Sequence, residues 1–223
     1  KKFSMGLIML VTFFIVLILM FMPLFDGKNA MEYLDNLYNS ISKGSAYYIP
    51  NAKEKIQPAK GAMASFTADL KDQKQAEKTQ ILFEKAGAEA IVEGSKLKIK
   101  GDLGTIFESI IQDSDSFYKN DGQTIATRYG YEERDAMHNW AVALESAKKD
   151  FQKQKEFKFA NYVEDVIGKA LAPAYNYYKI EPQHIKDKMG IIILSLVFYV
   201  VYTLWYGFGI LFLFEGWGMK LDH

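Results

Sequence analysis

Cysteine is absent from all 223 residues of the chain. Without thiols the protein forms no disulfide, no thiolate zinc site, no cysteine-ligated iron–sulfur cluster and no haem linkage through C-x-x-C-H. The sequence also lacks the G-x-S-x-G, H-E-x-x-H and phosphate-loop motifs of common catalytic sites. We therefore expect a protein that is not an enzyme and that holds no cofactor and no metal.

An excess of either charge is missing too. Lys and Arg together number 27, and Asp and Glu together also number 27. Opposite charges are interspersed along the polar part of the chain, so it offers no basic face that would neutralise phosphates. Nucleic acid is therefore not an expected partner.

Charge is entirely missing from two long apolar runs, residues 6–25 and 190–214. A helix rises about 1.5 Å per residue, so the first run is long enough for a hydrocarbon core of about 30 Å, and the second spans it with some tilt. The first run has no A-x-A cleavage pattern, which favours a retained anchor over a signal peptide. The sequence predicts transmembrane helices over 1–25 and 190–214, an intervening domain over 26–189 and a short cytoplasmic tail over 215–223, with the lipid bilayer as one partner.

The orientation prediction rests on a few lysines at the ends of these runs. Lys1 and Lys2 precede the first run and Lys220 follows the second. Lys28, Lys186 and Lys188 flank the other ends, but they belong to a long connecting domain, and long domains cross largely regardless of charge. Because positive charges beside short segments tend to stay in the cytoplasm, both termini are expected there and the central domain outside. In a bacterium with two membranes this predicts a protein of the cytoplasmic (inner) membrane with a periplasmic domain.

The predicted fold class is mainly α, with the two terminal transmembrane helices bracketing an extracytoplasmic helical bundle that carries a small β-hairpin. The hairpin is predicted near residues 88–100, where apolar and polar residues alternate on both sides of Gly94-Ser95. A lone hairpin is marginally stable in water, so its apolar face is expected to pack on helices.

Helical spacing of apolar residues predicts most of the remaining domain. A short amphipathic helix is expected over 30–42, a second helical segment over 62–86, and two strongly periodic helices over 137–151 and 159–178. Asp102 is placed to cap a helix that runs to about Tyr118.

The second apolar run carries a pattern of its own, which we call the tyrosine seam. Its members recur mainly at spacings of four and three, the pattern of a helix that packs on another helix. In lipid, small residues allow close approach of helices and hydroxyl groups form hydrogen bonds across the contact. The seam is predicted to bind another subunit, although packing on the chain's own first span is an open alternative. It consists of Ser195, Tyr199, Tyr202, Thr203, Tyr206, Gly207 and Gly209.

Other polar motifs give weaker signals. His138 and His184 lack neighbours at ligand spacing, so a surface role is favoured over metal binding or catalysis. The run from Asp113 to Ser116 begins like a calcium loop but lacks its glycine and later ligands. Trp217 and the group Tyr175, Tyr177 and Tyr178 fit the aromatic belts that line membrane interfaces.

Two functions remain open on these observations. The seam and the missing catalytic motifs favour a non-catalytic accessory subunit of a larger membrane complex, for example a respiratory or transport complex, which docks partners through the second span and the outer domain. The alternative is an extracytoplasmic sensory or ligand-binding module of a membrane receptor, a layout that two spans around a helical domain also provide.

Overall fold

The computed structural model describes residues 1–25 and 27–219. The chain divides into two compact units, one formed by residues 1–45 with 181–223 and the other by residues 46–180. We call the first the hairpin unit and the second the central unit. Residues 27–45 and 181–189, expected in the central domain, belong by their contacts to the hairpin unit.

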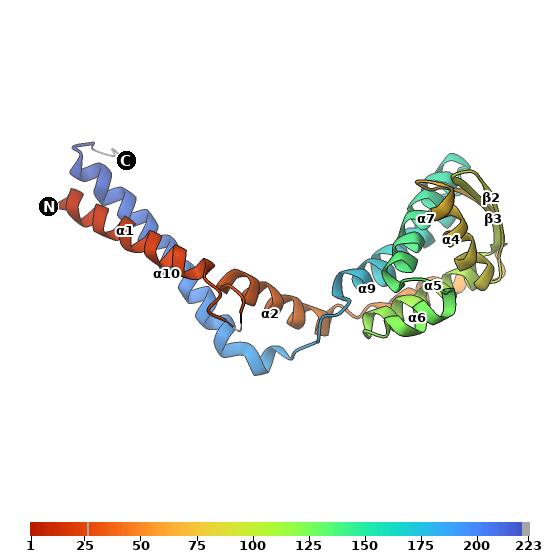
Figure 1. Cartoon of the computed structure of the whole chain (residues 1–223). Coiled ribbons are helices and arrows are strands. Elements are labelled where there is room, and N and C mark those ends of the chain that lie inside the picture. The colour runs from red at the N-terminus through yellow and green to blue at the C-terminus, as the bar shows by residue number, and fades with distance from the viewer. Residues whose placement is uncertain (26, 220–223) are drawn as a thin grey trace. The chain divides into compact units, whose positions relative to one another are not determined.

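The hairpin unit contains three helices, α1 (Lys2–Phe21), α2 (Ala30–Ser45) and α10 (Ile185–Gly216). Helices α1 and α10 lie side by side (Figure 1). Both are long and apolar enough to cross a membrane, and almost none of their residues is buried in a protein core. The predicted short helix after the first run is confirmed as α2, which begins with a reciprocal capping pair between Asn29 and Glu32.

The central unit is mainly helical with a small antiparallel sheet, as the sequence predicts in outline. The elements of its first half are α3 (Ile49–Lys55), η1 (Gln57–Ala59), β1 (Met63–Asp69), α4 (Gln73–Lys85), β2 (Glu89–Glu93) and β3 (Lys96–Asp102). Those of its second half are α5 (Leu103–Tyr118), α6 (Gly122–Tyr129), α7 (Glu133–Lys153), α8 (Phe157–Val166), the π-helical turn η2 (Ile167–Leu171) and α9 (Ala172–Tyr177). Asp102 caps α5 as predicted, accepting a hydrogen bond from the Thr105 amide.

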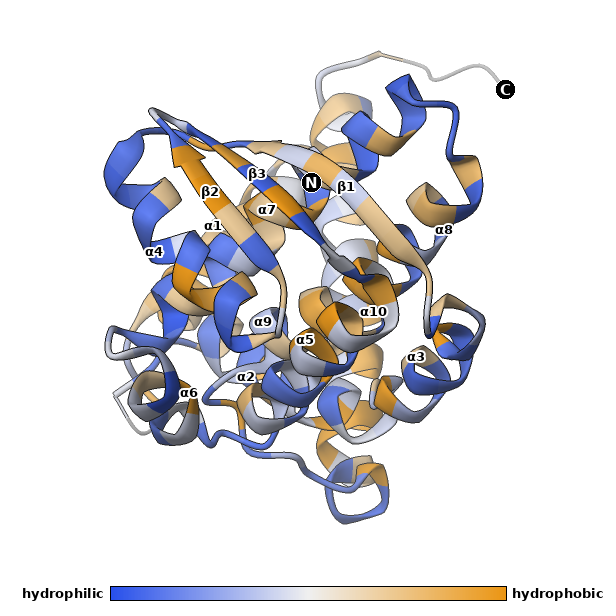
Figure 2. Cartoon of the chain, turned by 90° about the vertical axis from the view of Figure 1, so that its right-hand side faces the viewer, coloured by the Kyte–Doolittle hydropathy of each residue, from blue (hydrophilic) through white to orange (hydrophobic). Residues whose placement is uncertain are grey.

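The sheet has the order β1-β3-β2, with both outer strands antiparallel to β3 (Figure 2). The hairpin of β2 and β3 is confirmed, and its turn places Gly94 at φ +63°. The prediction of helix over 62–86 is wrong for its first part, which forms β1. Ala64, Phe66 and Ala68 alternate toward the core, but two alanines give a faint strand signal, and Phe66 and Leu70 fit helical spacing equally well.

Helix side chains cover both free edges of this sheet. On β1, the Thr67 amide donates to Asp150 (2.9 Å) and the Asp69 amide donates to Ser146 (2.7 Å), both on α7. On β2, the Gln80 side-chain amide of α4 donates to the Ala90 carbonyl (2.9 Å). Exposed strand edges invite pairing with other chains, so these contacts close the sheet against edge-to-edge association.

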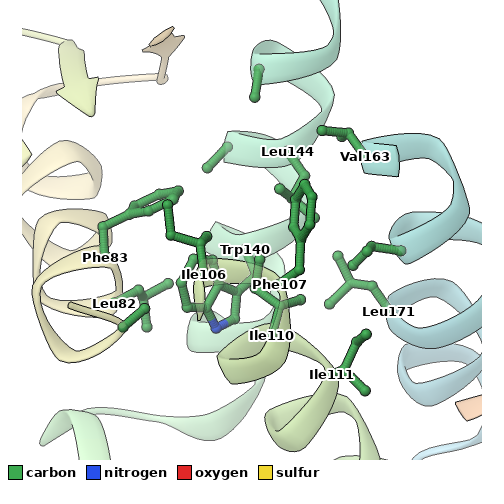
Figure 3. Packing of buried hydrophobic residues seen from close by; sticks show 14 of the residues in the cluster. Leu82, Phe83, Ile106, Phe107, Ile110, Ile111, Trp140, Leu144, Val163 and Leu171 are labelled. Atoms are coloured by element: carbon green, nitrogen blue, oxygen red, sulfur yellow. The ribbon is translucent and has the colours of Figure 1, made fainter. Parts of the chain in front are cut away.

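The core of the central unit lies between the sheet and the helices. Figure 3 shows Phe83 of α4 facing Trp140 of α7, with Ile106 and Phe107 of α5 beside them. Phe83 and Trp140 meet edge to face at a centroid distance of 4.9 Å. The second periodic helix contributes Val163 and, beyond the π-helical turn before Pro173, continues as α9. Proline removes a backbone donor and crowds the preceding turn, which accounts for the irregular turn there.

Candidate functional site

Glycines set the distance between α1 and α10. The buried residue of α1 is Gly6 and that of α10 is Gly209. A Cβ atom at Gly6 would lie 2.5 Å from the backbone nitrogen of Leu213, and Gly216 lies equally tightly against the backbone of Phe3. The two backbones therefore approach as closely as small residues permit, which is the usual way helices pack in lipid.

Polar contacts complete this helix pair. The Tyr202 hydroxyl donates to the Phe13 carbonyl (3.2 Å), and the two rings stack at a centroid distance of 4.2 Å. At one end of the pair, Lys2 Nζ lies 2.9 Å from Glu215 Oε2. Glu215 therefore lies in the last turn of α10 rather than in the predicted tail, whose residues 220–223, His223 among them, lie outside the described part of the chain.

The structure divides the tyrosine seam between two faces of α10. Tyr202, Tyr206 and Gly209 lie against α1, where the Tyr206 ring is 5.0 Å from that of Phe13. Ser195 is hydrogen-bonded to Tyr38 of α2 (2.8 Å between the oxygens). Part of the seam thus serves the chain's own helices.

The rest of the seam faces outward. Tyr199 is 68% exposed, and a Cβ at Gly207 would meet no atom within 4 Å. Thr203 is exposed, and its hydroxyl donates to the Tyr199 carbonyl one turn earlier (2.7 Å). Within the residues that the structure describes, the Tyr199 hydroxyl has no hydrogen-bond partner. Tyr199, Thr203 and Gly207 form what we call the outer strip of α10.

A cavity lies within the hairpin unit at the end of α1 that leads into α2. Its volume is about 390 Å³, and α1, α2 and α10 all contribute to its wall. The part of the lining that comes from described residues is apolar apart from the side chains of Tyr33 and Ser195. Sequence patterns gave no indication of this cavity, because it depends on how α2 and the start of α10 are placed beside the end of α1.

The central unit holds a buried carboxylate, Asp113, in the middle of α5. It accepts hydrogen bonds from Arg128 Nη1 (2.5 Å), the Tyr129 hydroxyl (2.5 Å) and Trp140 Nε1 (3.0 Å). Burial raises the pKa of the Asp113 carboxyl above its ordinary value, against the opposing effects of Tyr129, Trp140 and Arg128. These hydrogen bonds connect α5 to α6 and α7. The acidic run that begins at Asp113 therefore lies within helix α5, and the Asp113 carboxylate lies in the core.

The aromatic group near the end of the central unit is only partly a surface feature. Tyr178 is 7% exposed, stacks on Phe117 at a centroid distance of 3.6 Å and donates to Glu133 (2.7 Å). The hydrogen bond from Tyr178 is the largest cause that lowers the pKa of the Glu133 carboxyl. The belt interpretation is therefore wrong for Tyr178, which is a core residue, whereas Tyr175 and Trp217 are exposed.

The two described histidines lie on the surface. His138 is exposed on α7 beside Asp69 and Glu145, and His184 precedes α10. Among the described residues, no group of three His, Cys, Asp or Glu side chains is arranged to hold a metal ion. Comparison of the chain with family models, with curated proteins and with solved structures found no match.

Proposed function

We propose that this protein is a non-catalytic accessory subunit of a membrane protein complex, anchored by α1 and α10 and docked on a partner helix through the outer strip of α10. The observation that carries the proposal is the Tyr199 hydroxyl. It lies near the middle of the apolar part of α10, is 68% exposed, and has no hydrogen-bond partner among the described residues.

The free energy of an unpaired Tyr199 hydroxyl depends on whether it lies in water or in lipid. In water an exposed tyrosine is solvated, but in hydrocarbon an unpaired hydroxyl costs roughly 1–3 kcal/mol by mutational estimates. A neighbouring helix with a carbonyl or hydroxyl at this depth would satisfy it. Gly207, two turns along the same strip, leaves room for close approach of such a helix.

The proposed location follows from the pairing of α1 with α10. Because the helices are antiparallel, Lys2 and Glu215 lie at the same end, and Lys1 adds a second positive charge there. By the positive-inside rule we propose that this end is cytoplasmic and the central unit periplasmic, in a bacterium with two membranes. Lys28, Lys186 and Lys188 at the other end belong to a long segment that crosses largely regardless of charge. The natural absence of cysteine makes this testable: Ser95→Cys should react with a membrane-impermeant maleimide in intact cells, and Lys1→Cys should not.

The docking proposal is tested by purification from native membranes in mild detergent. We expect one or more further subunits in stoichiometric amounts with the unaltered protein. Tyr199→Leu should weaken that association while the central unit remains folded. Phe208→Leu is the matched control, because it makes a similar change on an exposed face of α10 away from the strip.

Two results would contradict the proposal. One is a partner that is retained equally by Tyr199→Leu and Phe208→Leu. The other is a monodisperse single protein that binds a small molecule, which would favour the alternative of a sensory or ligand-binding module. Tyr202→Leu is informative in a different way, since that residue contacts α1 and its loss should loosen the chain's own helix pair.

A further inference from the structure

The cavity of the hairpin unit has the properties of a binding site for an apolar chain. Its volume of about 390 Å³ falls within the range of small-molecule sites. The wall includes Leu19 and Met20 of α1, Ala30 and Leu34 of α2, and Leu194 and Phe198 of α10. Among the residues that the structure describes, no charged side chain lines it, so these residues offer a charged group no counter-ion inside.

Specific contacts hold α2 in place around this space. At its start, the rings of Phe25 and Tyr33 stack at 5.3 Å, and Phe25 and Lys28 exchange two backbone hydrogen bonds of 3.0 and 2.9 Å. Two turns into α2, the Tyr38 hydroxyl meets Ser195 at 2.8 Å. Polar and aromatic contacts therefore fasten α2 on both sides of an apolar gap, which makes the gap a built feature of this unit.

The mouth of the cavity opens on the apolar exterior of the helix pair. Leu24, Leu194 and Phe198 line the cavity and are also 60%, 67% and 40% exposed. Water is a poor occupant, because a buried water needs two to four polar partners. The described wall residues include two hydroxyl-bearing side chains, and one of them, Ser195, is already hydrogen-bonded to Tyr38. In a bilayer the material at this mouth is the acyl chains of lipids.

Two lysines lie close in the chain to residues of the cavity wall. Lys28 is exposed and is paired through its backbone with Phe25 in the wall. Lys188 lies three residues before Ile191, another wall residue, and so occupies the same face of α10 one turn away. Positive charge beside an apolar cavity at the end of a span suits a phosphate attached to an acyl chain.

We propose that this cavity binds one acyl chain of a membrane phospholipid, with the lipid phosphate held near Lys28 and Lys188. The proposal shares with the proposed function the insertion of α1 and α10 in a bilayer, but it does not depend on docking to another subunit. A bound chain would fill the gap that otherwise separates α2 from the helix pair.

Photo-crosslinking in vesicles tests this site on the full chain. The probe is a phosphatidylglycerol with a diazirine at the end of one acyl chain, diluted in phosphatidylcholine vesicles that contain the protein. After irradiation, mass spectrometry locates the adducts. We expect several-fold more adducts on cavity residues of α2, such as Leu34, than on Val200 and its exposed neighbours on α10.

Two variants make the test specific. Ala30→Phe places a ring in the cavity and should reduce adducts on α2 to the level of the exposed α10 surface, whereas Val200→Phe, an equally large change on an exposed position, should not. Lys28→Gln, which alters no packed side chain, should reduce labelling by the phosphatidylglycerol probe. It should leave labelling by a diacylglycerol with the same reactive chain unchanged.

The outcomes separate this inference from the proposed function. Adducts on α1 and α10 without enrichment on α2, or enrichment that survives Ala30→Phe, would overturn the acyl-chain site while leaving the membrane anchor intact. Absence of adducts on all three helices would overturn both, because α1 and α10 would then not lie in lipid.

Discussion

The two units of this chain differ in which residues make their internal contacts and which face outward. In the hairpin unit the contact between α1 and α10 is made by glycines and hydroxyl groups, and large apolar side chains such as Leu194 and Val200 face outward. In the central unit Phe83 and Trp140 are fully buried, and charged residues cover the surface. An exposed apolar surface is typical of helices that pack in lipid, and a buried apolar core is typical of a domain that folds in water.

The physical reason lies in what drives packing in each solvent. In water, burial of apolar surface is the main favourable term, so large side chains gather inside the central unit. In lipid, an apolar side chain gains little from leaving the hydrocarbon, so helix contacts rely on close backbone approach and hydrogen bonds. The following variants should therefore act on one unit and spare the other.

The largest effect is expected from Arg128→Ala in the central unit. Removal of the guanidinium leaves the buried Asp113 carboxylate without its cation, which costs about 3 kcal/mol when one partner of a buried pair is lost. Amide hydrogen exchange of the full chain should report this loss in α5, α6 and α7. Lys119→Ala, which removes an exposed partner of Asp115, is the control and should cost less than about 1 kcal/mol.

Gly6→Leu should act on the other unit. Its side chain would strike the backbone of α10 near Leu213, and overpacking of this kind costs about 1–3 kcal/mol. We expect loss of the α1–α10 contact, seen as increased proteolysis of the connecting segments in detergent, with unchanged exchange in the central unit. Gly190→Leu, at a glycine with no atom within 4 Å of an added Cβ, should have no such effect. Equal damage by both variants would contradict the close contact at Gly6.

Asp150→Ala should expose one edge of the small sheet. The variant leaves the Thr67 amide without its acceptor, which costs about 1–2 kcal/mol for a partly buried donor. Faster hydrogen exchange at Thr67 is expected, with that of the hairpin turn at Gly94 unchanged. Lys149→Ala, an exposed neighbour on α7, serves as the control, and identical exchange in the two variants would show that α7 does not protect the strand.

The smallest effect is a change in pH dependence. Because burial raises the pKa of Asp113 in the folded state, the stability from this carboxyl is full below its unfolded pKa of about 4 and is lost as pH rises through the folded value. An asparagine at this position does not titrate, so the stability of Asp113→Asn lacks this dependence on pH. The stability advantage of the unaltered protein over Asp113→Asn should therefore shrink as pH rises above about 4, and a widening advantage would contradict the raised pKa.

Local signals in the sequence predicted several elements well. Asp102 marks the start of α5, Gly94-Ser95 marks the turn between β2 and β3, and the two charge-free runs form α1 and α10. Each of these signals consists of a few adjacent residues or of one long apolar run, so it can be recognised without knowledge of tertiary contacts. Tertiary contacts were needed for the rest.

Three features show what local patterns miss. Strand β1 depends on pairing with β3, since Ala64 and Ala68 carry little strand preference of their own. In the sequence Asp113 belongs to an acidic run that looks solvated. Its partners Arg128 and Trp140 lie 15 and 27 residues later, so no local pattern shows that the carboxylate is buried. The tyrosine seam has helix-packing spacing, but which of its members face α1 depends on the rotation of α10 about its axis.

Disulfide formation in native membranes tests the paired membrane helices most directly, since the chain has no cysteine of its own. A Cβ at Gly209 would lie 3.5 Å from the Cβ of Met9, within the range of about 3.5–4.5 Å that a disulfide requires. Met9→Cys combined with Gly209→Cys should form an intramolecular disulfide on mild oxidation. Met9→Cys combined with Gly207→Cys should not, because Gly207 faces outward. Equal cross-linking of both pairs, or none in the first, would contradict the antiparallel contact of α1 and α10.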